Sequence, residues 1–164
     1  MAAGDTVGIF YPENNNPPAS AAAIPDTRNA HPVLDFNADA DRSAVFPGLM
    51  PRNYAGGGVQ VILHWMATTA TTGDVKWDVQ WEQSTGQDID SDGFAAAQTA
   101  TATTHGTSGI ATETTIAFTN GAQMDSVVAG NAYRLKVTRD ADAAGDTMLN
   151  DAELFRVEVR ETPA

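Results

Sequence analysis

The sequence predicts an all-β protein, a single antiparallel β-sandwich of jelly-roll type with about eight strands. Short segments of alternating apolar and polar residues recur along the chain, and turn residues such as Gly, Asn and Asp separate them. Only one segment has helical spacing. Connections of irregular length favour a jelly roll over an up-and-down meander, and eight strands favour it over a seven-strand immunoglobulin-type sandwich.

Residues 1–26 are expected to form an extended N-terminal arm, and residues 27–164 to form the jelly-roll domain. Four prolines in the first segment disfavour helix and central strand. Two interpretations stay open: a flexible tail, or an arm that orders against a neighbouring subunit or partner. The second is suggested by large apolar side chains that a solvated tail does not need. These candidate partner-binding residues are Ile9, Phe10, Tyr11 and Ile24.

Eight segments read as strands because their apolar residues alternate or because they are rich in β-branched residues between turn signals. The last of them places Phe155, Val157 and Val159 on the apolar parity. Between the sixth and seventh, the spacing of Met124, Val127 and Val128 predicts one short helix. The predicted strands are HPVLDF (31–36), SAVFPGL (43–49), GVQVILHWMA (58–67), DVKWDVQWEQ (74–83), FAAAQTATATT (94–104), IATETTIAFT (110–119), YRLKVTRD (133–140) and AELFRVEVRE (152–161).

Two tryptophans on one strand raise the question of a sugar-binding platform. Trp77 and Trp81 share a face with Val75 and Val79, and at strand rise they lie about 13 Å apart, a spacing that suits stacking on successive sugar rings. The opposite parity carries charged and amide side chains. Because valines beside the tryptophans have no use in a platform, we predict that both rings are buried in the core or in a subunit interface.

The charge and the apolar content of the sequence argue against two classes of partner, nucleic acids and membranes. The net charge is -12, with nine Lys and Arg against 21 Asp and Glu, and no basic stripe is available to neutralise phosphates. Nucleic acid is therefore not an expected partner. The longest apolar run, VQVILHWMA, is much shorter than the roughly 18 residues of a membrane span, so no membrane partner is expected either.

The acidic segment DIDSDGF matches the first half of a calcium loop through Asp88, Asp90 and Asp92. The twelfth position of such a loop needs a bidentate Glu, and here it holds Thr99. We therefore predict an ordinary acidic hairpin loop, with a weak Ca²⁺ site as the alternative and no other cofactor. The three histidines lie in unrelated contexts and no serine lies in a nucleophile elbow, so we expect no enzyme.

The sequence resembles a family of small tailed-bacteriophage and prophage proteins, virion surface components of jelly-roll type. The resemblance covers about residues 26–161. It is carried by DTRNAHPVLDFNADADRSAVFPGLMPRNYAGGGVQVILHWMATTATTGDVKWDVQWEQ, DIDSDGFAAAQTATATT and AGNAYRLKVTRDADAAGDTMLNDAELFRVEVRE.

The resemblance implies a non-enzymatic structural protein of the virion, a capsid decoration or cement protein that binds the outer capsid surface and stabilises the head. Its implied partners are the major capsid protein and two copies of itself in a homotrimer, assembled in the host cytoplasm. The alternative function is a tail or head fibre module that binds a cell-surface glycan of the host.

Overall fold

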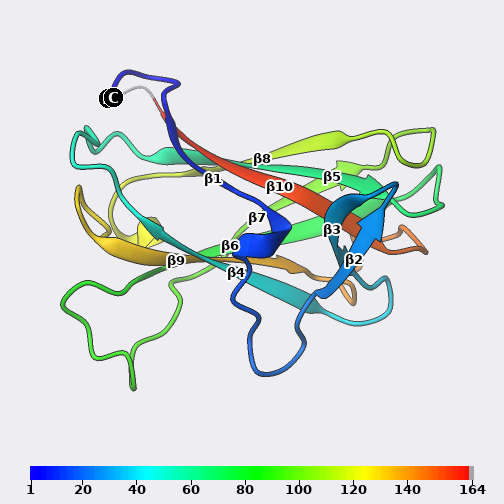
Figure 1. The fold of residues 1–164 in the computed structure, drawn as a ribbon, viewed down its shortest axis with the longest axis horizontal. Helices are drawn as coiled ribbons and strands as arrows, with labels where there is room; N and C mark the ends of the chain where they lie inside the picture. Colours follow the sequence, from blue (N-terminus) through cyan, green and yellow to red (C-terminus); the bar gives the residue numbers. More distant parts are fainter. Residues whose placement is uncertain (163–164) are drawn as a thin grey trace.

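The computed structural model describes residues 1–162 and consists of two β-sheets packed face to face (Figure 1). All strand pairs within the sheets are antiparallel, and helical structure in this part of the chain is limited to two short 3₁₀ turns, η1 and η2. The elements are β1 Thr6–Phe10, η1 Pro12–Asn14, β2 Ile24–Arg28, β3 His31–Phe36, β4 Arg42–Leu49, β5 Val59–Ala67, β6 Asp74–Gln83, β7 Gln98–Thr103, β8 Thr112–Phe118, η2 Ala122–Met124, β9 Ala132–Arg139 and β10 Ala152–Glu161.

The larger sheet has six strands in the order β2-β3-β10-β5-β8, with β1 also paired to β10. The smaller sheet has the order β4-β9-β6-β7. Neighbouring strands in each sheet are mostly distant in sequence, as expected of a jelly roll. The fold class predicted from the sequence is confirmed.

All eight predicted strands are present, and DVKWDVQWEQ and AELFRVEVRE match β6 and β10 residue for residue. The predicted helix is reduced to the single turn η2, which buries Met124 and leaves Val128 exposed. Asp125 and Ser126 both have positive φ, a conformation that stops helix growth after one turn. No helix within residues 1–162 is long and apolar enough to cross a membrane.

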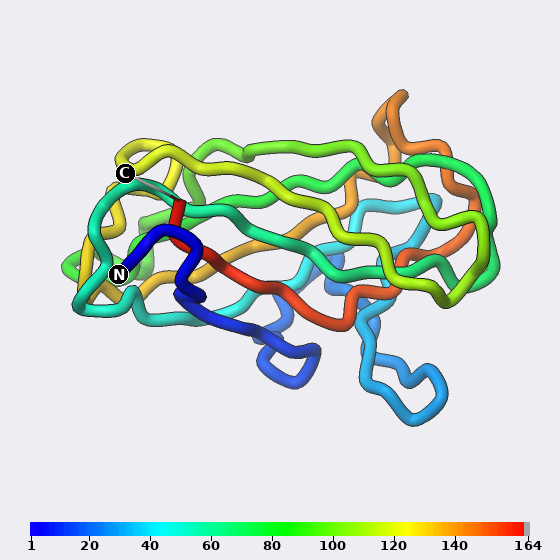
Figure 2. The backbone as a smooth tube through the Cα atoms, turned by 90° about the horizontal axis from the view of Figure 1, so that it is seen from above, coloured from blue at the N-terminus to red at the C-terminus, as the bar shows by residue number. Residues whose placement is uncertain are grey.

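The N-terminal segment is extended, as expected, but it pairs with the strands of its own domain and does not form a separate arm. Figure 2 shows β1 beside β10, and the register places Phe10 opposite Val157. The chain then runs along the edge of the smaller sheet, where Asn16 N donates to Val45 O at 2.8 Å, and returns as β2 beside β3. Residues 1–26 thus contribute β1 and the first three residues of β2, and they cover the edge strand β4.

The core lies between the sheets and contains all three tryptophans, each fully buried. The Trp77 ring packs edge-to-face against Phe36 at 5.1 Å and against Trp65 at 5.8 Å between ring centres. Trp81 packs on Tyr133 at 4.6 Å. The prediction that Trp77 and Trp81 are buried is confirmed, so these two rings form no platform for sugar.

Candidate functional site

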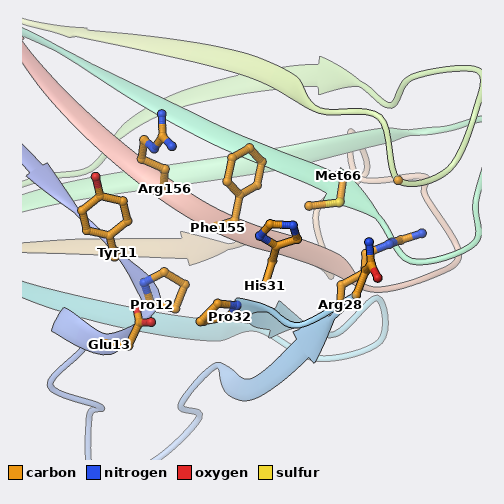
Figure 3. A pocket seen from close by; sticks show the side chains of 11 residues that line it. Tyr11, Pro12, Glu13, Arg28, His31, Pro32, Met66, Phe155 and Arg156 are labelled. Carbon is orange, nitrogen blue, oxygen red and sulfur yellow. The ribbon is translucent and has the colours of Figure 1, made fainter.

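A groove of about 530 Å³ opens on the outer face of the six-stranded sheet (Figure 3). Its walls come from the β1–η1 junction, the β2–β3 hairpin, β5, the β7–β8 connection and β10. Aromatic, proline and arginine side chains dominate this lining, a mixture typical of a ligand site. The lining residues are Tyr11, Pro12, Glu13, Arg28, Asn29, His31, Pro32, Met66, Gly109, Phe155 and Arg156.

A β-bulge in β10 creates the centre of this groove. Leu154 pairs with Trp65 and Arg156 pairs with His64, so Phe155 is one extra residue on the β10 side. The bulge reverses the parity of the strand: Leu154 and Val157 both face the core, and Phe155 turns to the outer face. The prediction that Phe155 shares the buried face with Val157 is therefore wrong, because a bulge interrupts the alternation.

Arg156 lies between two aromatic side chains of the groove. Its guanidinium carbon is 5.7 Å from the centre of the Tyr11 ring and 6.0 Å from that of Phe155, both within cation–π range. Tyr11 is 46% exposed, so one ring remains open to solvent beside the charge. The result is an exposed aromatic surface with a positive group at its middle.

Arg28 is held rigidly at the other end of the groove. Its Nη1 donates to the carboxylate of Glu153 and to Ala67 O at 2.9 Å, and its Nη2 donates to Thr68 O at 3.2 Å. Gly109 lies directly against it: a Cβ there would come within 2.8 Å of Nη2, and the φ of +78° also favours glycine. Arg28 therefore acts as a fixed wall.

His64 lies on the outer face next to the groove, as its parity predicts. The Nδ1 atom is 3.4 Å from a Glu113 oxygen across the β5–β8 pair, and the ring is 6.0 Å from that of Phe155. Burial lowers the pKa of His64, against the opposing effect of Glu113. The imidazole thus supports the Phe155 ring from beneath the bulge.

Beneath the groove, Asp35 faces Glu153 across the β3–β10 pair. Burial, followed by the charge of Glu153, raises the pKa of Asp35 to about 6, and Arg28 opposes this change. One oxygen, Oδ1, is buried without a hydrogen-bond partner in residues 1–162. The folded protein therefore favours the protonated acid, which has a proton to donate.

We predict that Asp35 makes the stability of the protein depend on pH between about 4 and 6. An unfolded Asp titrates near 3.9, so the folded state binds more protons in this window and loses stability as the pH rises through 6. The D35N variant should be more stable than wild type above pH 6 by about 1–2 kcal/mol, after discounting for solvent screening at this half-buried group. Urea unfolding from pH 4 to 8 measures this, and D39N, which removes an exposed carboxylate elsewhere, should keep the wild-type profile. An unchanged profile in D35N would contradict the assignment.

The predicted partner-binding residues of the N-terminal segment have different environments. Phe10 is buried and packs on Phe46 with ring centres 5.6 Å apart. Ile9, Tyr11 and Ile24 are each about 45% exposed. Only Tyr11 belongs to the groove, and partner binding by the four residues stays a prediction.

The predicted calcium loop forms the exposed connection between β6 and β7. Asp88 closes a turn there: its carbonyl accepts hydrogen bonds from Ser91 N and Asp92 N, and its Oδ1 accepts one from Asp90 N at 3.2 Å. Within residues 1–162, the carboxylates of Asp88, Asp90 and Asp92 do not gather at one point. The turn itself agrees with the predicted hairpin loop, and a bound Ca²⁺ stays a prediction.

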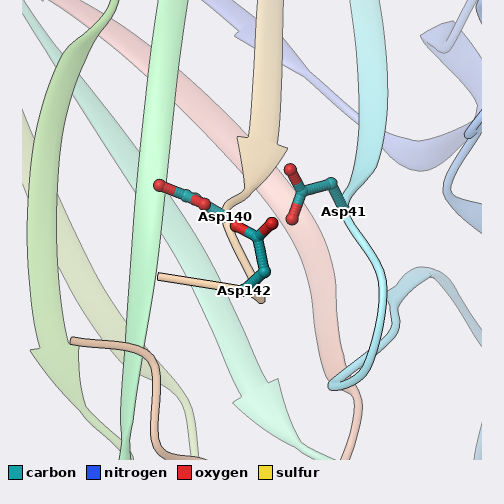
Figure 4. A group of neighbouring side chains, drawn as sticks. All are labelled: Asp41, Asp140 and Asp142. Atoms are coloured by element: carbon teal, nitrogen blue, oxygen red, sulfur yellow. The ribbon is translucent and has the colours of Figure 1, made fainter. Parts of the chain in front are cut away.

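Three other carboxylates do meet, at the loop end where β9 finishes and β4 begins (Figure 4). Oxygens of Asp41, Asp140 and Asp142 lie within 4.8 Å of one another. The chain itself supplies partners: Lys76 Nζ pairs with Asp140, and Asp41 accepts a hydrogen bond from Ala141 N at 2.8 Å. We assign no metal to this cluster.

The sequence reasoning missed the groove because its residues come from five separate segments. One signal was available in β10, where apolar residues occupy even positions up to Leu154 and odd positions from Phe155 onwards. A change of phase inside a strand is the sequence mark of a bulge. Nothing comparable in the sequence points to Tyr11 or Arg28 as neighbours of Phe155.

The structure is a β-sandwich of jelly-roll type with an open groove on the outer face of its six-stranded sheet. No family model matches the chain, and no curated protein matches it in sequence. Solved structures share the fold. The CBM22-1 xylan-binding domain of Paenibacillus barcinonensis Xyn10C matches with a TM-score of 0.55 and 11% identity, covering 100% of this chain and 99% of that domain.

Two further structures are similar. The CBM22-2 xylan-binding domain of the same enzyme has a TM-score of 0.54 and 10% identity, covering 95% of this chain and 99% of the domain. The K3 adhesin domain of Lys-gingipain from Porphyromonas gingivalis has a TM-score of 0.54 and 15% identity, with the same coverage of 95% and 99%. At these identities the likeness is one of fold.

Proposed function

We propose that this protein is a non-catalytic glycan-binding module and that the groove on the six-stranded sheet is its binding site. The observation that carries the proposal is the pairing of Tyr11 and Phe155 at a groove, one exposed and one turned outward by a bulge. Apolar faces of sugar rings pack on aromatic rings, and polar side chains around them hold the hydroxyls. The groove offers both kinds of contact.

The fold neighbours support this proposal because two of them are xylan-binding domains. Similarity of fold alone does not establish that two proteins bind the same ligand, so the proposal depends mainly on the residues of the groove. Glycan binding was the alternative function considered from the sequence, and the groove offers a candidate site for it on the sheet face.

The groove also favours binding over hydrolysis. Glycoside hydrolysis by the common route needs two carboxyl groups on either side of the scissile bond. Among the described residues that line the groove, Glu13 is the one carboxylate. The nearby Glu153 is buried in its ion pair with Arg28.

We expect Y11A and F155A each to weaken glycan binding by about tenfold or more, because each removes one stacking surface. The measurement is a glycan array with wild-type protein, followed by calorimetry on the best ligand. L149A is the matched control, since Leu149 is 88% exposed and lies outside the groove. Silence across a broad array, or wild-type affinity in both aromatic variants, would overturn the proposal.

Attachment to a capsid, as the resemblance to virion surface proteins implies, is a second candidate function. The exposed apolar side chains Ile9 and Ile24 favour it, since they have no role in the groove. Truncation of residues 1–26 is a poor test because it removes β1 and the first three residues of β2 from the sheet. Co-sedimentation of the full-length I9S/I24S variant with empty capsids tests attachment and keeps the sheet complete. The homotrimer and the location on the capsid surface stay proposals, like attachment itself.

A further inference from the structure

Within residues 1–162, Arg156 forms no ion pair, although the protein is strongly acidic. Five of the nine Lys and Arg side chains form ion pairs: Arg28, Lys76, Arg134, Arg139 and Arg160. The other four form none within residues 1–162, and Arg156 is the one of these four that lines the groove.

Two carboxylates beside Arg156 on this sheet, Glu158 and Glu113, have other partners. Glu158, two residues away on the same strand, accepts from Arg160 and from Thr6 Oγ1. Glu113, opposite His64, lies 3.4 Å from the imidazole. Within residues 1–162 this guanidinium therefore has no ion-pair partner, and it lies over the rings of Tyr11 and Phe155.

We infer that the groove selects a saccharide that carries a carboxylate, a uronic acid or a related acidic sugar, and that Arg156 is the residue that recognises it. This inference rests on the proposed function. The planar guanidinium donates two parallel hydrogen bonds to a carboxylate, and such charge-assisted bonds are about twice as strong as neutral ones. The rings of Tyr11 and Phe155 supply the stacking surface beside it.

The remaining charges of the groove are compatible with one acidic group at this point. Arg28 adds a second guanidinium, already neutralised by Glu153, and His31 is exposed at the β2–β3 turn. Glu13 lies on the wall with Tyr11 and opposes an anion there. The acidic sugar should therefore bind at Arg156, and neutral sugar rings should occupy the rest of the groove.

The test compares acidic polysaccharides with their own carboxyl-reduced forms. Polygalacturonate, alginate, glucuronoxylan and hyaluronan are suitable probes, each used native and reduced, so that the carboxylate is the only difference. Calorimetry or affinity electrophoresis with wild type should give at least one native polymer bound about tenfold more tightly than its reduced form. Added salt should reduce this preference, since the groove is open to solvent.

In R156Q the ratio of the affinities for the native and the reduced polymer should fall to near one, while the affinity for the reduced polymer is kept. R156K keeps the positive charge but not the planar pair of donors, so its ratio should lie between those of wild type and R156Q. R160Q is the matched control. It removes the same charge from the same strand and face but lies outside the groove, so the preference should persist. Thermal unfolding of each variant confirms that the exposed substitutions leave the fold intact.

The outcomes separate the inference from the proposed function. Equal affinity of wild type for native and reduced polymers would overturn the acidic selectivity and leave glycan binding in place. A preference that survives in R156Q would overturn the role of Arg156. No binding to any polymer or array glycan would overturn the proposed function itself.

Discussion

R139M is expected to destabilise the protein by about 3–5 kcal/mol, because it leaves a buried carboxylate without its partner. The side chains of Arg139 and Asp146 are 0% and 1% exposed. The pair is bidentate: Nε donates to Asp146 Oδ2 at 2.9 Å and Nη2 donates to Oδ1 at 2.7 Å. Removing one partner of such a pair exposes the full desolvation cost of the other.

The guanidinium also satisfies three backbone carbonyls. Nη1 donates to Phe36 O at 3.1 Å and to Asn150 O at 2.8 Å, and Nη2 donates to Met148 O at 2.6 Å. These contacts join β3 to the connection that leads into β10. Because β10 carries Phe155 and Arg156, loss of Arg139 should also disturb the groove.

Equilibrium urea unfolding measures the effect of R139M. The control is R160Q, which breaks a partly exposed ion pair and should cost less than about 1 kcal/mol. R139K keeps the charge and loses the fork, so it should retain part of the stability. A loss below about 1 kcal/mol in R139M would mean that Asp146 finds another partner or is protonated without cost.

Alternation located most of the strands that have one buried face, and β-branched residues between turn signals located β7 and β8. Neither signal found β1 and β2, where four prolines in the segment indicated irregular backbone. Pro25 is tolerated inside β2 because that strand is the edge of its sheet and pairs on one side alone. An edge strand pairs on one side only and buries fewer side chains. The absence of proline and the alternation of apolar residues are therefore weaker sequence signals for edge strands.

The alternation of β9 could also have predicted half of the buried ion pair between Arg139 and Asp146. Tyr133, Leu135 and Val137 set the buried parity of β9, and Arg139 is the next residue on it. An arginine on a buried parity requires an acidic partner. The sequence contains several acids in the following loop, and alternation alone does not tell which one turns inward.

The groove was further from prediction because it depends on contacts between segments distant in sequence. Tyr11 reaches Arg156 only because β1 pairs with β10, and that pairing has no local signal. The resemblance to virion proteins carried no site residues in the groove. The groove could therefore be found only from the three-dimensional arrangement.

W77A is the second substitution with a large expected effect, about 3–5 kcal/mol of lost stability. Trp77 is fully buried between the two sheets, and its ring contacts both Phe36 and Trp65. Truncation to alanine removes the apolar transfer free energy of the indole and leaves a cavity that the surrounding strands close only in part.

Phenylalanine at the same position separates packing from hydrogen bonding. The indole Nε1 of Trp77 is buried without a hydrogen-bond partner in residues 1–162, so W77F loses contact area but no hydrogen bond. In Trp65, by contrast, Nε1 donates to Thr114 Oγ1 at 2.8 Å. W65F should therefore cost about 1 kcal/mol more than W77F, because it also leaves the threonine hydroxyl without that partner.

Urea unfolding of W77A, W77F and W65F under one set of conditions measures these differences. Near-ultraviolet circular dichroism of W77F should keep the native signal of the two remaining tryptophans, which confirms that the core is intact. Equal losses in W77F and W65F would show that the Trp65 hydrogen bond contributes nothing net. A loss in W77A no larger than that in W77F would show that the core relaxes around the missing ring, which close-packed β-sandwich interiors resist.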